Sequence, residues 1–238
     1  MRSKVFAITE PGRIEESERD ANTEEGQTLI RPVFTGICKS DINYFEGLLG
    51  NPVFVNYSEY NGFKEFIFVN EFFYTQAITN DSGRVLAYSI TTRKEDFNPE
   101  IELGPYTTEN KIIKVKLGKT KFYEIDGVSF GDPESIDSRL GVHDWFYSEE
   151  HYFGNPGNYQ SYFFSVNQAG YGNEFYPPAI KDQRDNTVKN PEIIDFRKNA
   201  IINTYTITVP MVNSKTLGLS NNENYLLGPD YNQVRVLR

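Results

Sequence analysis

The sequence predicts a strand-rich α+β fold, built on a mixed or antiparallel sheet with a few helices. Two-residue alternation is clearest at residues 111–117, where Ile113, Val115 and Leu117 alternate with lysines, as in a strand with one solvated face. A complete helix signal appears once, at residues 190–201. Aromatic residues form 15% of the chain, which is enough to bury a substantial core.

The first fifty residues predict a hairpin, a strand and a helix. Strands are expected at residues 5–8, 13–18 and 28–37, and a helix at residues 42–49. Pro11-Gly12 suits the hairpin turn, because proline presets φ and glycine accepts a positive φ. Ser40 and Asp41 are typical helix-start residues.

Beyond residue 50 the chain becomes rich in aromatic residues, and strands predominate. Residues 63–79 carry Phe and Tyr at mostly even spacing and predict a strand. The turn residues 80–83 join it to residues 84–92 in an expected hairpin. Residues 154–158 predict a loop followed by an aromatic strand, and residues 204–209 predict a last strand.

The expected helix near residue 190 has both a start signal and an apolar stripe. Asn190 is a suitable N-cap, Pro191 occupies the first turn and Glu192 lies beside it. The apolar residues that follow are Ile193, Ile194, Phe196 and Ile201. We expect this stripe to pack against the sheet.

Composition excludes several functional classes. A formal charge of −9 argues against non-specific binding to nucleic acid or to anionic membranes, which needs clustered Lys and Arg. Cys38 is the single cysteine, so neither an intramolecular disulfide nor a thiolate-only metal site can form. The sequence shows no signal-peptide pattern and no apolar run of about 18 residues. These features predict a soluble, cytoplasmic protein without a membrane span.

Residues 1–47 resemble the N-terminal, GroES-like segment of zinc-dependent medium-chain alcohol and sorbitol dehydrogenases. The resemblance rests on residues 29–32, Leu-Ile-Arg-Pro, on residues 35–41, Thr-Gly-Ile-Cys-Lys-Ser-Asp, and on residues 44–47, Tyr-Phe-Glu-Gly. It implies that Cys38 matches a catalytic zinc ligand and that Ser40 matches the residue that relays the alcohol proton. No cofactor is predicted from the sequence, and zinc is the one that the resemblance would imply.

The chain departs from that family after residue 47. The Gly-His-Glu segment that supplies the second zinc ligand in the family is missing, and the first histidine after Cys38 is His143. A catalytic zinc site needs three protein ligands. The sequence also has no Gly-x-Gly-x-x-Gly turn for a dinucleotide. We therefore expect no complete dehydrogenase site, and a small buried side chain is the alternative role for Cys38.

Residues 51–238 resemble an uncharacterised conserved domain of bacterial hypothetical proteins. The resemblance rests on four short stretches, residues 88–93, 117–122, 147–150 and 152–160. It implies no activity. The two resemblances together predict a gene fusion with a dehydrogenase-like fragment at residues 1–47 and an α+β domain at residues 48–238.

The densest polar and aromatic stretch runs from residue 143 to residue 159 and is the predicted binding site. Aromatic rings beside amide groups can stack on and hydrogen-bond a sugar, a base or a peptide. The predicted binding residues are His143, Asp144, Trp145, Glu150, His151, Asn155, Asn158 and Tyr159. The alternative is that the rings belong to the core and that the Asn and Gly residues form turns.

Two catalytic interpretations of the same stretch remain open. His143, Asp144, Glu149, Glu150 and His151 carry imidazole and carboxylate groups that suit several divalent metals. On a strand, however, Glu149 and Glu150 point to opposite faces. A nucleophile system of Cys38, His143 and Asp144 is the other interpretation, although adjacent His and Asp side chains rarely orient each other.

The leading hypothesis is a non-enzymatic domain that binds a ligand or a partner protein through residues 143–159, and no catalytic residue is assigned. The competing hypothesis is an enzyme, either a reduced zinc oxidoreductase based on Cys38 or a hydrolase that uses the carboxylates near His143. A third is an interaction module whose aromatic strand edges pair with another chain.

Overall fold

The computed structural model describes the first hairpin and most of the chain after residue 50. The described ranges are residues 2–10, 13–20, 50–58, 62–103, 113–125, 135–140, 145–155, 158–179 and 187–208, with single positions at 42, 46, 49, 133, 228 and 234. Cys38, His143 and Asp144 lie outside them.

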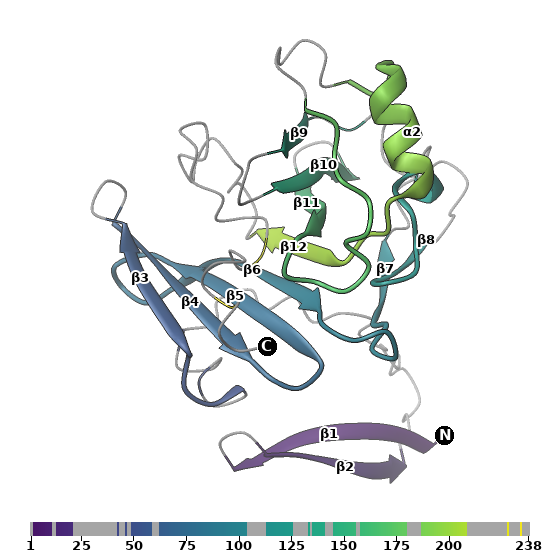
Figure 1. Cartoon of the computed structure of the whole chain (residues 1–238). Coiled ribbons are helices and arrows are strands. Elements are labelled where there is room, and N and C mark those ends of the chain that lie inside the picture. Colours follow the sequence, from purple (N-terminus) through teal and green to yellow (C-terminus); the bar gives the residue numbers. More distant parts are fainter. Residues whose placement is uncertain are drawn as a thin grey trace.

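One eight-stranded sheet forms the centre of the described structure (Figure 1). In spatial order its strands are β3 (Phe54–Ser58), β4 (Phe63–Val69), β5 (Phe73–Thr79), β6 (Val85–Thr92), β12 (Thr204–Thr208), β11 (Asn158–Asn167), β10 (Trp145–Asn155) and β9 (Ser135–Leu140). Every neighbouring pair is antiparallel. β12, the last strand among the described residues, joins the two halves of the sheet.

The remaining elements are smaller. They are the pair β1 (Arg2–Glu10) and β2 (Arg13–Asp20), the pair β7 (Glu100–Leu103) and β8 (Ile113–Lys116), the 3-10 helix η1 (Phe122–Ile125) and the helix α2 (Pro191–Asn199). The described part is therefore mostly β. The strand-rich prediction is confirmed, and the sheet is antiparallel rather than mixed.

Elements with strong local signals occur where the sequence predicts them. β1 and β2 form the expected first hairpin, with Ile8 opposite Ile14. β5 and β6 form the second, and its turn is closed by the side chain of Asn80, which accepts the N–H of Arg84 at 3.0 Å. In β8, Val115 is fully buried while Lys114 and Lys116 are exposed, so the predicted solvated face is confirmed.

Helix α2 is built as its signals predict. The side chain of Asn190 accepts the N–H of Glu192 at 2.9 Å, which satisfies one of the donors left over at a helix start. Ile193 and Phe196 are buried in the main core. The helix ends at Asn199, so Ile201 lies beyond it and forms an isolated bridge with Lys121.

The prediction of a single strand over residues 63–79 is wrong. β4 ends at Val69 and β5 begins at Phe73, because the side chain of Asn70 accepts the N–H groups of Phe72 and Phe73 at 2.8 Å and closes a turn. The turn inverts the even spacing: Phe68 lies opposite Thr75, and Tyr74 lies opposite Val69 on the other face.

The loop predicted at residues 154–158 is also mostly strand. β10 extends to Asn155, and β11 begins at Asn158, with those two residues paired. Gly154 lies opposite Tyr159. The two strands therefore pair up to Asn155 and Asn158. Backbone hydrogen bonds between strands can form even where glycine and asparagine lower the strand propensity.

Only part of the helix predicted at residues 42–49 is described. Ile42, Glu46 and Leu49 are helical, and Gly50 donates its N–H to the carbonyl of Glu46 at 2.9 Å. Ile42 and Leu49 pack against a core cluster formed by Phe68, Ala77, Val85 and Tyr88. Ile42 thus contributes to the packing of the sheet, although it precedes the predicted boundary at residue 47.

The two faces of the sheet differ in chemistry. The face that carries Tyr147 packs against α2, η1 and the β7–β8 pair to form the main core; we call it the helix face. The opposite face is polar near the centre of the sheet, where Gln76 donates a hydrogen bond to Glu65 at 2.5 Å and Ser89 donates one to Gln76 at 3.5 Å. All three of these side chains are buried.

Candidate functional site

Strand β10 presents four side chains of the predicted region to the helix face. Trp145, Tyr147, Glu149 and His151 are two residues apart in succession, and alternate residues of a strand point to the same face. All four are buried. Glu150 lies between them in sequence and therefore points to the opposite face, as the sequence predicts.

Glu149 is the centre of a buried hydrogen-bonded cluster. Its Oε1 accepts the hydroxyl of Tyr147 and the Nε–H of Arg197, both at 2.6 Å. Its Oε2 is 2.9 Å from Nε2 of His151 and accepts from Nη2 of Arg197 at 3.3 Å. Arg197 also donates to the carbonyl of Phe122 at 3.4 Å. The cluster therefore connects β10 with α2 and η1.

The charge state of Glu149 follows from two opposing effects. Burial acts to raise the pKa of the carboxyl group, because a charge is poorly solvated in the interior. The hydrogen bonds and charges of His151 and Arg197 act the other way and prevail, so the pKa lies below its ordinary value. Glu149 is therefore a carboxylate at neutral pH and neutralises the charge of Arg197.

The arrangement indicates a structural role for Glu149 rather than a reactive one. A carboxylate offers about four acceptor positions, and here four contacts occupy them. A general base or metal ligand needs an accessible lone pair. Within the described ranges, no three His, Cys, Asp or Glu side chains converge on a position for a metal ion.

The outer end of β10 leads from this buried cluster to the surface. Trp145 is 6% exposed and lies opposite Leu140 of β9, which is 45% exposed. The ring of Tyr176 meets the Trp145 ring edge-on, with centroids 5.5 Å apart, and is 68% exposed. Trp145, Leu140 and Tyr176 form what we call the Trp145 surface.

The segment that carries Tyr176 is attached to the sheet. Ser138 of β9 donates its hydroxyl hydrogen to the carbonyl of Pro178 at 2.7 Å, and Pro178 follows Tyr176 closely in sequence. Phe175 is also exposed. The Tyr176 ring is thus fixed on two sides, by the Trp145 ring and by its backbone.

The predicted binding residues do not all gather at one place. Trp145 belongs to the Trp145 surface, His151 belongs to the buried cluster and Glu150 is buried on the other face. Asn155, Asn158 and Tyr159 lie in the paired ends of β10 and β11. His143 and Asp144, with the proposed zinc ligand Cys38, lie outside the described residues.

Sequence reasoning missed Arg197 and Tyr176. Arg197 had a usable signal: it follows Ile193 by four residues, so it lies in the apolar stripe of the helix, where a charge needs a buried partner. Tyr176 lies in irregular chain between elements and had no such signal.

Comparison with known proteins places the chain in no family. No family model matches the sequence, and no curated protein matches it. One solved structure is similar in outline, an extracellular protein containing a SCP domain from Bacillus anthracis, with 8% identity and a TM-score of 0.36. The match covers 79% of this chain and 50% of that protein, so this chain spans about half its length.

The described residues also include no helix that is long and apolar enough to cross a membrane.

Proposed function

We propose that the chain is a non-enzymatic binding domain that takes an apolar or aromatic segment of a partner protein on the Trp145 surface. The observation that carries the proposal is the Tyr176 ring, which is exposed yet held against the buried Trp145. Binding sites concentrate energy in aromatic residues that are rigid before the partner arrives.

The chemistry of the surface favours a protein segment over a nucleic acid. Leu140 and Tyr176 are both exposed and apolar or aromatic, and they suit an apolar side chain of a partner. The net charge of −9 opposes a polyanion. The fully occupied carboxylate of Glu149 supports a binding role rather than a catalytic one for this region.

The test uses the fluorescence of Trp145, which is the single tryptophan of the chain. Short synthetic peptides with a central Phe or Leu are titrated into the protein, beside the same peptides with Asp at that position. We expect a saturable change in emission with the apolar peptides only. Tyr176→Ala should weaken binding about tenfold or more, because truncation of an aromatic anchor commonly removes more than about 1.4 kcal/mol.

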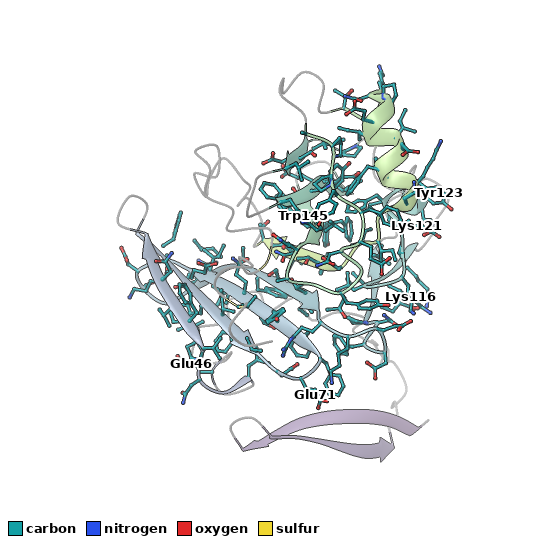
Figure 2. All side chains as sticks on the ribbon, viewed as in Figure 1. Glu46, Glu71, Lys116, Lys121, Tyr123 and Trp145 are labelled. Atoms are coloured by element: carbon teal, nitrogen blue, oxygen red, sulfur yellow. The ribbon has the colours of Figure 1, made fainter. Side chains whose placement is uncertain are left out.

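The matched control is Tyr123→Ala. Tyr123 is also an exposed tyrosine, but it lies on η1, and Figure 2 shows it apart from Trp145. Its replacement should leave the peptide affinity unchanged. The proposal fails if no apolar peptide gives a saturable signal, or if both tyrosine variants lose affinity equally.

A further inference from the structure

Strand β3 ends the sheet with an edge that carries no charge. It is the terminal strand of the eight, and among the described residues only β4 pairs with it. Residues 51–58 read Asn-Pro-Val-Phe-Val-Asn-Tyr-Ser. Val53 is 47% exposed and Val55 is 54% exposed. An exposed edge of this kind is a template for another strand.

The opposite edge of the sheet is different. β9 carries Asp137 and Arg139, and charged residues on an edge strand oppose pairing with a second chain. The contrast therefore selects β3 as the edge that can accept another strand.

The charges that flank β3 indicate which strand it accepts. Glu46 lies in the helical segment just before β3, and Figure 2 places it beside the lower end of the β3–β4 pair. Lys64 of β4 lies opposite Tyr57, near the other end of β3. A carboxylate, Glu46, thus lies near the beginning of the edge, and the lysine Lys64 lies near its end.

Both charged residues are on the same side of the sheet. Lys64 shares a face with Phe66 and Phe68, because these residues alternate along β4. Leu49, in the helical segment of Glu46, packs against the cluster that contains Phe68. An antiparallel pair of β3 strands related by a two-fold axis keeps the two faces aligned and brings Glu46 of one copy to the end that holds Lys64 of the other.

From this geometry we infer that β3 is a self-association edge, at which a second copy of this chain adds its own β3 in the antiparallel direction. The two sheets then continue as one, and Val55 of each copy is covered by the other. Two-fold dimers are the commonest closed assemblies, and each contact in them occurs twice. This surface is separate from the Trp145 surface, so the inference does not rest on the proposed function.

The experiment is sedimentation velocity over a concentration series on the full chain. Wild type should pass from monomer to dimer as concentration rises. Val55→Lys should weaken association about tenfold or more, because each copy then brings an additional positive charge to the pairing edge. Tyr123→Lys, at a similarly exposed position on η1 and away from both edge strands, should leave association unchanged. Val53→Lys serves as a second edge variant if Val55→Lys does not fold.

Charge reversal tests the direction of pairing. Glu46→Lys and Lys64→Glu should each weaken the dimer, because each places like charges together twice. The double variant Glu46→Lys/Lys64→Glu should restore association towards that of wild type. The inference is overturned if wild type stays monomeric at every concentration, if Tyr123→Lys dissociates the dimer as much as Val55→Lys does, or if the double variant is no better than the single ones.

Discussion

Glu149 is a buried carboxylate whose partners come from both the sheet and helix α2. Its side chain is 0% exposed and meets a tyrosine, a histidine and an arginine. A buried charge is tolerated only where partners replace the water that it has lost. The cluster therefore fixes the position of α2 on β10. Glu149 and Arg197 each provide the counter-ion that the other needs in the interior.

Replacing Glu149 by Gln tests this dependence. The substitution keeps the shape of the side chain but leaves Arg197 buried without its counter-ion. Breaking such a pair commonly lowers the free energy of unfolding by about 3–5 kcal/mol, and urea denaturation measures the change. Asp195→Asn, on an exposed position of α2, should change stability by less than about 0.5 kcal/mol.

The same variant gives a pH dependence with a defined sign. The folded-state pKa of Glu149 lies below the unfolded value of 4.5, so its charge stabilises the fold above about pH 4.5. That contribution is lost as pH falls through the lowered pKa. The stability difference between wild type and Glu149→Gln should therefore shrink on acidification below pH 4.5. A difference that stays constant as the pH falls further below 4.5 would show that shape, rather than charge, accounts for the loss.

Among the elements, those with several local signals could be predicted, whereas the turn between β4 and β5 could not. Helix α2 and the β5–β6 hairpin have cap or turn residues that act within a few positions. The turn that separates β4 from β5, at residues 70–72, is marked in the sequence by Asn70 alone. The aromatic residues before and after this turn lie at mostly even spacing. The pattern therefore predicted one strand, although the chain reverses direction at the turn.

The N-cap of α2 can be tested by Asn190→Ala. The side chain of Asn190 satisfies the N–H of Glu192, and its loss should reduce the free energy of unfolding by about 1 kcal/mol. Chemical denaturation provides the measurement. Lys189→Ala, one residue earlier and exposed, should have almost no effect. Equal losses in the two variants would mean that the cap does not act through this hydrogen bond.

At the scale of the whole molecule, the spatial order of the strands in the sheet explains why the candidate site could not be predicted from the sequence. β12 is the last of the described strands in sequence, yet it lies between β6 and β11. Glu149 and Arg197 are 48 positions apart in sequence and meet only because α2 packs over the sheet. The alternation of β10 predicted which residues share a face, but not that α2 covers that face.

The predicted boundary at residue 47 leads to a test on the whole chain. Ile42 donates its N–H to the carbonyl of Gly83 at 3.0 Å and packs against the Phe68 cluster. We therefore expect residues 48–238 alone to melt at a lower temperature than the full chain, because apolar surface of β4 to β6 becomes exposed. Differential scanning calorimetry gives both midpoints.

The control for this truncation removes residues 1–20 only. β1 and β2 pair with each other in a separate sheet, so their loss should change the midpoint much less. If residues 48–238 melt at the temperature of the full chain, the boundary is that of an independent domain, and the contact of Ile42 contributes little.

The sequence by itself determined the strand-rich class, the two hairpins, the solvated face of β8 and the start of α2. Each of these depends on interactions between residues close in the chain, where propensity and spacing act directly. Only the tertiary structure decided that Glu149, His151 and Arg197 form a buried cluster, and that Trp145 supports an exposed tyrosine. These pairings join distant segments, and their energy comes from burial, which exists only after the sheet and helix have packed together.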